Sequence, residues 1–159
     1  MATAAEDSTA TLLKVPPHSI EAERSVLGGL LLDENAWDSV SGILTAGDFY
    51  RGDHRIIYRC MQQLVEQNSP LDIITISESL DAVSELENVG GLAYISDLAD
   101  GTPTASNIRA YADIVQERAT VRKLISAAHD IADSGFNPQG RDSATLIDQA
   151  ESRGFKIGD

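Results

Sequence analysis

Residues 105–134 have the sequence ASNIRAYADIVQERATVRKLISAAHDIADS, which is the most informative part of the chain for its architecture. Neither proline nor glycine interrupts it, and about 30 residues at about 1.5 Å each would form a helix roughly 45 Å long. A small domain is only about 30 Å across. The sequence therefore predicts a helical segment that reaches beyond any compact domain on which it packs.

The apolar stripe of this segment changes faces near residue 120. At about 100° per residue, the apolar residues before this point cluster on one side of a helix and those after it on nearly the opposite side. The first set is Ile108, Tyr111, Ala112, Val115 and Ala119, and the second is Val121, Leu124, Ile125, Ala128, Ile131 and Ala132. Two arrangements remain open. Either two helices meet near residue 120, or one long helix packs its first half on a head and offers its second half to another element.

The residues that follow supply a partner for the second half. Residues 136–140 (FNPQG) are typical of a turn, and Ser143 begins a helical pattern with Leu146, Ile147 and Ala150 on one side. The simplest arrangement is an antiparallel helical hairpin over residues 104–157. Gly154 costs about 1 kcal/mol of helix stability relative to alanine, so the end of this helix is expected to fray.

Residues 14–103 are expected to form a compact helical head, preceded by a disordered tail over residues 1–13. Ser19 can cap a first helix, Asp72 can cap another, and Gly90 and Gly91 form a turn before a short one. The apolar residues that define the successive helices are Val26, Leu27, Leu30 and Leu31; Trp37, Val40 and Leu44, ending near Gly47; Ile56, Ile57, Cys60, Met61, Leu64 and Val65; and Leu92, Ile95, Leu98 and Ala99. The β-branched run at residues 73–76 also fits a strand, but no second strand exists to pair with it. The fold class is therefore all-α.

The composition and net charge of the chain limit the classes of function that it can have. The chain has 159 residues, of which 42% are hydrophobic and 23% charged, as in ordinary globular proteins of about one domain. Its formal net charge of −13 would repel a phosphate backbone. Residues 1–103 carry 5 basic and 17 acidic side chains, so the acidity belongs to the head. With one cysteine, no signal peptide and no long apolar run, a cytoplasmic protein without membrane contact is expected.

The sequence offers no catalytic, cofactor or metal site. The segment Gly42–Gly47 has the glycine spacing of a phosphate loop, but Asp48 and Phe49 replace the lysine and hydroxyl that the loop requires. His18, His54 and His129 lie far apart, with no partner at metal-ligand spacing, and are expected to be solvated or structural. Cys60 lies on a core stripe, where burial raises the pKa of a thiol. The chain itself is therefore not expected to be an enzyme. Two classes of function remain: an interaction and oligomerisation module, and an acidic helical nucleic-acid-binding module, which the charge disfavours.

Several stretches resemble the N-terminal domain of bacterial replicative DNA helicases of the DnaB family. They are KVPPHSIEAERSVLGG (residues 14–29), DFY (48–50), HRIIY (54–58), DIIT (72–75), GGLAY (90–94), TPTASNI (102–108), YADIV (111–115) and FNPQG (136–140). The resemblance runs from about Lys14 to Ile157. It implies a helical head and hairpin that pack with copies of themselves, as a dimer or a hexamer, into the collar of a ring-shaped helicase.

The resemblance also implies partners and a missing domain. Primase would dock on the collar through its C-terminal helicase-binding domain, and a helicase loader or phage proteins are further candidate partners. An ATPase domain that binds ATP and magnesium and holds most of the DNA would follow a linker, so this chain is expected to bind little or no DNA directly.

Three residues are predicted to bind partners. Tyr94 is placed roughly 110° from the centre of its inward stripe, so it is expected to stand off the core on the primase-facing surface. Ile125 and Ile131 lie near the edges of the second stripe, where one partner helix would not cover both. They are expected to carry self-association, with full burial inside the hairpin as the open alternative.

Overall fold

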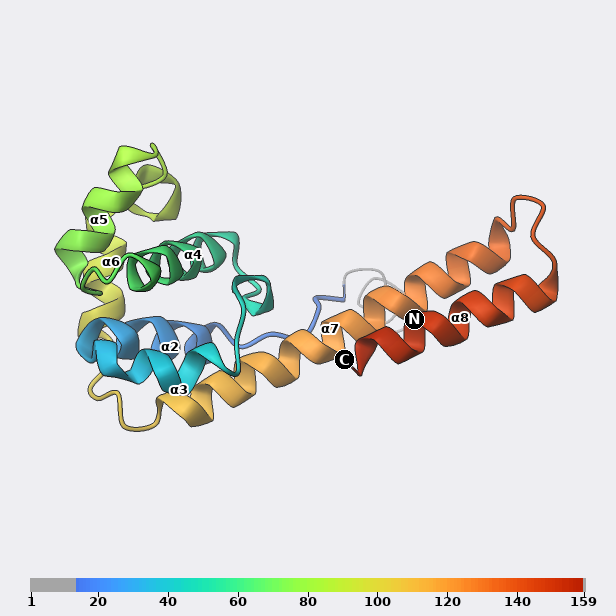
Figure 1. Ribbon diagram of the computed structural model, residues 1–159, viewed down its shortest axis with the longest axis horizontal. Coiled ribbons are helices and arrows are strands. Elements are labelled where there is room, and N and C mark those ends of the chain that lie inside the picture. Colours follow the sequence, from blue (N-terminus) through green and yellow to red (C-terminus); the bar gives the residue numbers. More distant parts are fainter. Residues whose placement is uncertain (1–13, 159) are drawn as a thin grey trace, which may run out of the picture.

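The computed structural model describes residues 14–158, and every regular element in that range is a helix (Figure 1). The expected tail over residues 1–13 lies outside the described residues. The α-helices are α2 (Ile20–Leu32), α3 (Trp37–Ser41), α4 (Gly52–Glu66), α5 (Ile73–Ala82), α6 (Gly91–Asp100), α7 (Ile108–Phe136) and α8 (Ser143–Ile157). Short 3-10 helices occupy Glu34–Ala36, Ala46–Asp48 and Glu87–Val89. The prediction of an all-α head followed by an antiparallel hairpin is confirmed.

Side-chain caps set where the helices begin. The Ser19 hydroxyl accepts a hydrogen bond from the Ala22 amide at 3.2 Å, which satisfies one of the free donors at the start of α2. Asp72 caps α5 in the same way, so the β-branched run after it is helical rather than extended. The second predicted helix is shorter than expected, because α3 ends at Ser41 and Leu44 lies beyond it.

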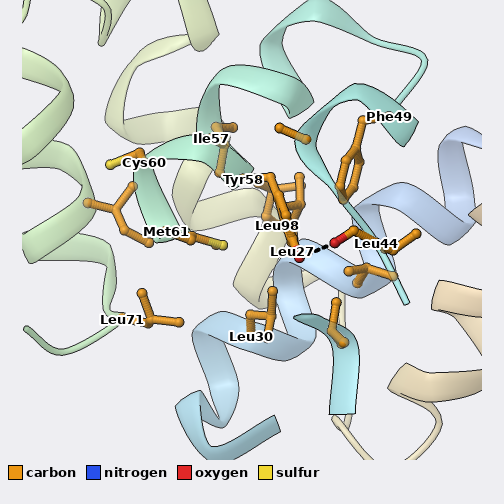
Figure 2. Packing of buried hydrophobic residues seen from close by; sticks show 14 of the residues in the cluster. Leu27, Leu30, Leu44, Phe49, Ile57, Tyr58, Cys60, Met61, Leu71 and Leu98 are labelled. Carbon is orange, nitrogen blue, oxygen red and sulfur yellow. Dashed lines mark hydrogen bonds between the residues drawn. The ribbon is translucent and has the colours of Figure 1, made fainter. Parts of the chain in front are cut away.

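The core forms where α2, α4 and α6 meet. Figure 2 shows Leu27 and Leu30 of α2 pointing towards Ile57 and Met61 of α4 and Leu98 of α6, and these five side chains are at most 1% exposed. The Tyr58 hydroxyl, buried beside them, donates a hydrogen bond to the Leu44 carbonyl at 3.1 Å. Burial, with the nearby charge of Asp48, raises the pKa of Tyr58 to about 12. Cys60 belongs to the same core, and burial raises the pKa of its thiol, as expected.

Two glycines let helices approach α2 closely. A Cβ atom at Gly28 would lie 2.1 Å from the Thr102 hydroxyl and 2.2 Å from the Leu98 carbonyl oxygen. At Gly29 it would lie 2.9 Å from Ile108. Any larger residue at Gly28 would therefore push the end of α6 away from α2, which places the Gly28-Gly29 pair at the centre of the head.

The long segment is one helix of 29 residues, α7, which settles the alternative left open by its switched stripe. Its first half packs on the head and buries Ile108, Ala112, Val115 and Ala119. Arg122 marks the point where α7 leaves the head, since its guanidinium donates to the Pro17 carbonyl at 2.8 Å and the Asp48 carbonyl at 2.6 Å. Beyond that point α8 runs back along α7 (Figure 1). It continues through Gly154 to Ile157, so Gly154 does not end the helix.

Candidate partner-binding surfaces

Tyr94 lies on the inner side of α6, partly buried against the core. The prediction that it stands off the core is wrong. It took Leu92 as an inward residue, whereas Leu92 is 53% exposed and the buried residues of α6 are Ile95 and Leu98. Tyr94 lies four residues before Leu98 and therefore shares its face of the helix. Only part of the ring is left for a partner.

A buried chain of hydrogen bonds holds the Tyr94 hydroxyl. His54 of α4 is fully buried, with Nε2 2.6 Å from the Tyr94 hydroxyl and Nδ1 2.8 Å from Oε1 of Glu23 on α2. The Glu23 carboxylate, 1% exposed, also accepts the Tyr50 amide at 2.8 Å and the Arg51 amide at 3.4 Å. Such a network is stable only when each member has its partners, so Glu23, His54 and Tyr94 tie α2, α4 and α6 together as one unit.

Two arginines lie at the Tyr94 ring. The guanidinium carbons of Arg24 and Arg51 lie 5.4 Å and 5.3 Å from the ring centroid, within the range of a cation–π interaction. Burial raises the pKa of the Tyr94 hydroxyl, while the positive charges of Arg51 and Arg24 act to lower it. Because the burial effect is larger, the hydroxyl is protonated at neutral pH and can share a hydrogen bond with His54.

Sequence reasoning missed this cluster because its members are far apart in the chain. His54 lies 31 residues from Glu23 and 40 from Tyr94. One signal was present: Glu23 occupies the first position of an i, i+3, i+4, i+7 stripe with Val26, Leu27 and Leu30, where an acidic residue is out of place. A glutamate on the buried face of a helix is stable only if its carboxylate has a hydrogen-bond or ion-pair partner, so this position predicts one.

Ile125 and Ile131 lie on the part of α7 that has left the head. They are 38% and 37% exposed, and neighbouring Leu124 is 56% exposed. No described residue of α8 is buried. The half-buried residues in the middle of this part of α7 are Ala127 and Ser134, so α8 covers that side of the helix. Full burial of the stripe inside the hairpin is therefore excluded, and an apolar edge of α7 stays open.

The remaining candidates have ordinary structural settings. His18 stacks on Tyr50 with ring centroids 4.1 Å apart, His54 belongs to the buried network, and His129 is exposed. Across residues 14–158, His, Cys, Asp and Glu side chains form no group of three or more that could hold a metal ion. Among the described helices, none has both the length and the apolar character needed to cross a membrane.

Comparison with known proteins points to one family. The sequence model of the DnaB-like helicase N terminal domain matches residues 15–117. The replicative DNA helicase DnaB of Haemophilus influenzae is 41% identical over 153 residues, which are 96% of this chain and 33% of that protein. The chain thus spans about a third of the length of this relative.

Solved structures agree with the sequence match. The N-terminal domain of DnaB helicase from Mycobacterium tuberculosis superposes with a TM-score of 0.86 at 36% identity, covering 89% of this chain and 99% of that one. A DnaB-like replicative helicase, described with its interactions with primase, superposes with a TM-score of 0.71 at 27% identity. The match covers 86% of this chain and 31% of the helicase.

Proposed function

Because the chain belongs to the DnaB-like helicase N terminal domain family, we propose that it forms the collar of a ring-shaped replicative DNA helicase and provides the docking surface for primase. The observation that carries the proposal is the match over 86% of this chain to a helicase described with its primase interactions. In the whole protein, the collar would join an ATP-driven DNA-unwinding hexamer in the bacterial cytoplasm.

Self-association is assigned to the open edge of α7. An exposed apolar row on a slender hairpin favours burial against another surface. This row includes Leu124, with Ile125 and Ile131 at its two edges. In a two-fold symmetric dimer, the same residues of a second copy would face them. The proposed oligomer is a dimer or a larger closed ring.

Primase docking is assigned to the surface around Tyr94. The part-exposed ring, fixed by His54 and flanked by arginines, offers apolar area at low conformational cost, and tyrosine and arginine are enriched among residues that dominate binding energy. The partner is the C-terminal helicase-binding domain of primase. A helicase loader or phage proteins would compete for the same surface.

The described residues do not fit ATP or magnesium. The Gly42–Gly47 segment follows α3 rather than a strand and leads into a 3-10 helix, and Asp48 turns its carboxylate back to the Thr45 amide at 2.9 Å. ATP and magnesium are therefore assigned to a C-terminal ATPase domain of the whole protein. The alternative function, an acidic nucleic-acid-binding module, is disfavoured by the net charge of −13.

Calorimetric titration of the primase C-terminal domain into this chain tests the docking proposal. Saturable binding by the wild type is expected. Tyr94→Ala should weaken it about tenfold or more, and Tyr94→Phe, which keeps the ring, much less. Circular dichroism must confirm that both variants are folded at the titration temperature. No binding by the wild-type chain would overturn the proposal.

A further inference from the structure

The two arginines beside Tyr94 differ in what their guanidinium groups bind. Arg51 is committed to Asp53, since its Nε donates to Oδ1 at 3.0 Å and its Nη2 donates to Oδ2. Arg24 makes neither a hydrogen bond nor an ion pair with any group in residues 14–158. Within the described part of the chain its donors are therefore unused, and its guanidinium lies over the Tyr94 ring.

The described neighbours of Arg24 pack against its side chain without binding its donors. It is half-buried and stacks on the Tyr94 ring, whose hydroxyl is fixed by the buried His54. A Cβ at Gly101 would be 4.0 Å from Nη2 of Arg24, so the guanidinium reaches the C-terminal end of α6, which carries partial negative charge. A shallow pocket between α2 and the end of α6 opens beside it, lined by Glu21, Arg24, Ser25, Leu98, Gly101 and Thr102.

Arg24 is one of few basic residues in an acidic head. Residues 1–103 contain 5 basic and 17 acidic side chains, and one of the basic residues, Arg55, already donates to the Phe49 and Tyr50 carbonyls. A planar guanidinium whose donors have no partner within residues 14–158 matches the two oxygens of a carboxylate. The surrounding acidity, which includes Glu21 in the pocket, repels the many charges of a phosphate chain more strongly than the single charge of a carboxylate side chain. A protein carboxylate therefore suits the site better than a nucleic acid.

We propose that Arg24, stacked on Tyr94, binds a carboxylate side chain of the docked primase domain. This inference rests on the proposed docking function and adds the chemistry of the contact. The ring supplies apolar area and keeps the guanidinium in place, and Arg24 supplies the charged hydrogen bonds that select an acidic residue on the partner. Arg51, whose charge is neutralised by the ion pair with Asp53, makes the second cation–π contact to the Tyr94 ring.

The test is titration of the primase C-terminal domain into Arg24→Gln, with Arg59→Gln as the matched control. Arg59 is exposed on α4 and lies outside the Tyr94 cluster, and both variants lose one positive charge. Arg24→Gln should weaken binding about five- to tenfold at low salt, and Arg59→Gln less than about twofold. The difference should shrink as salt rises. Arg24→Glu should be rescued by a lysine in place of the partner's acidic residue.

The outcomes separate this inference from the docking proposal. Wild-type binding that Arg24→Gln and Arg59→Gln reduce equally, or not at all, would overturn the carboxylate contact and leave docking intact. If the wild type does not bind, docking and the contact fail together. If Arg24→Gln weakens binding of a single-stranded oligonucleotide but not of primase, Arg24 contacts phosphate and the inference is wrong. Urea unfolding of each variant measures its stability and so distinguishes weaker binding from loss of the folded state.

Discussion

At the scale of single residues, the Glu23–His54–Tyr94 network couples stability to the proposed docking surface. His54 is fully buried, and its Nε2 atom lies within hydrogen-bonding distance of the Tyr94 hydroxyl. A buried polar atom that loses its partner keeps its full desolvation cost. A tyrosine placed for recognition therefore also maintains the packing of α4 against α6.

Tyr94→Phe should lower the free energy of unfolding by about 1–3 kcal/mol, because it leaves the His54 ring nitrogen buried without a partner. Urea denaturation followed by circular dichroism measures this. Tyr111→Phe is the matched control: Tyr111 is also half-buried, but its hydroxyl has no hydrogen-bond partner within residues 14–158. Equal stability of Tyr94→Phe and the wild type would show that the network contributes nothing.

The Asp72 cap of α5 should give part of the stability a pH dependence. Its carboxylate accepts the Thr75 amide and hydroxyl, both at 2.7 Å, and these bonds hold its pKa below the ordinary value of 3.8. A lowered folded-state pKa means that the stabilisation is present above the unfolded-state value and is lost as pH falls through the folded-state value.

Asp72→Ala should therefore lower the free energy of unfolding by about 1 kcal/mol at pH 7. This difference in stability from the wild type should shrink as the pH falls below 3.8. Chemical denaturation at a series of pH values tests this. Asp72→Asn serves as the control, since asparagine caps helices about as well but does not titrate. A stability difference between Asp72→Ala and the wild type that does not change at acid pH would contradict a stabilising role of the ionised Asp72 carboxylate.

At the scale of elements, the helices were largely predictable and the contacts between them were not. Ser19 and Asp72 begin helices as their cap chemistry requires. Four of the six residues of the predicted α4 stripe are buried, and the other two, Ile56 and Val65, are half-buried. The continuity of α7 could not be read from its stripe, because a change of face fits one helix or two. Tyr94 was misplaced because the exposed Leu92 was counted as core, which local periodicity alone cannot correct.

Ile125→Asp or Ile131→Asp should lower the dimer or higher-order population while the far-ultraviolet spectrum stays helical. Both side chains are more than one-third exposed in the single chain, so a charge there disturbs an interface more than the fold. Sedimentation velocity over a concentration series measures the change. Ser126→Asp adds the same charge about 100° around α7 from Ile125, on an exposed polar face, and should leave association unchanged. Loss of helix in the isoleucine variants would contradict an interface role.

At the scale of the whole molecule, the layout separates two surfaces. The hairpin of α7 and α8 extends away from the head (Figure 1). Tyr94 and Arg24 belong to the head, whereas the exposed Ile125 and Ile131 belong to the hairpin. Arg122 joins the two parts by binding carbonyls of the N-terminal segment and of the 3-10 helix before α4. The proposed docking surface and the proposed self-association edge therefore lie on different parts of the molecule.

The net charge of −13 should keep this chain off DNA. Fluorescence anisotropy with a labelled single-stranded oligonucleotide should detect no micromolar binding at physiological salt, because the acidic head repels phosphates. Micromolar affinity that falls steeply with added salt would contradict this and favour the nucleic-acid-binding alternative.

In the proposed arrangement, one chain carries both a primase-binding head and a self-associating hairpin. Sedimentation velocity of the chain mixed with fluorescently labelled primase C-terminal domain tests both parts together. Labelled primase should sediment with an oligomer of the wild-type chain, and with a smaller species when Ile125→Asp and Ile131→Asp are combined. Labelled primase that sediments alone in the presence of the wild-type chain would show that the head does not bind primase.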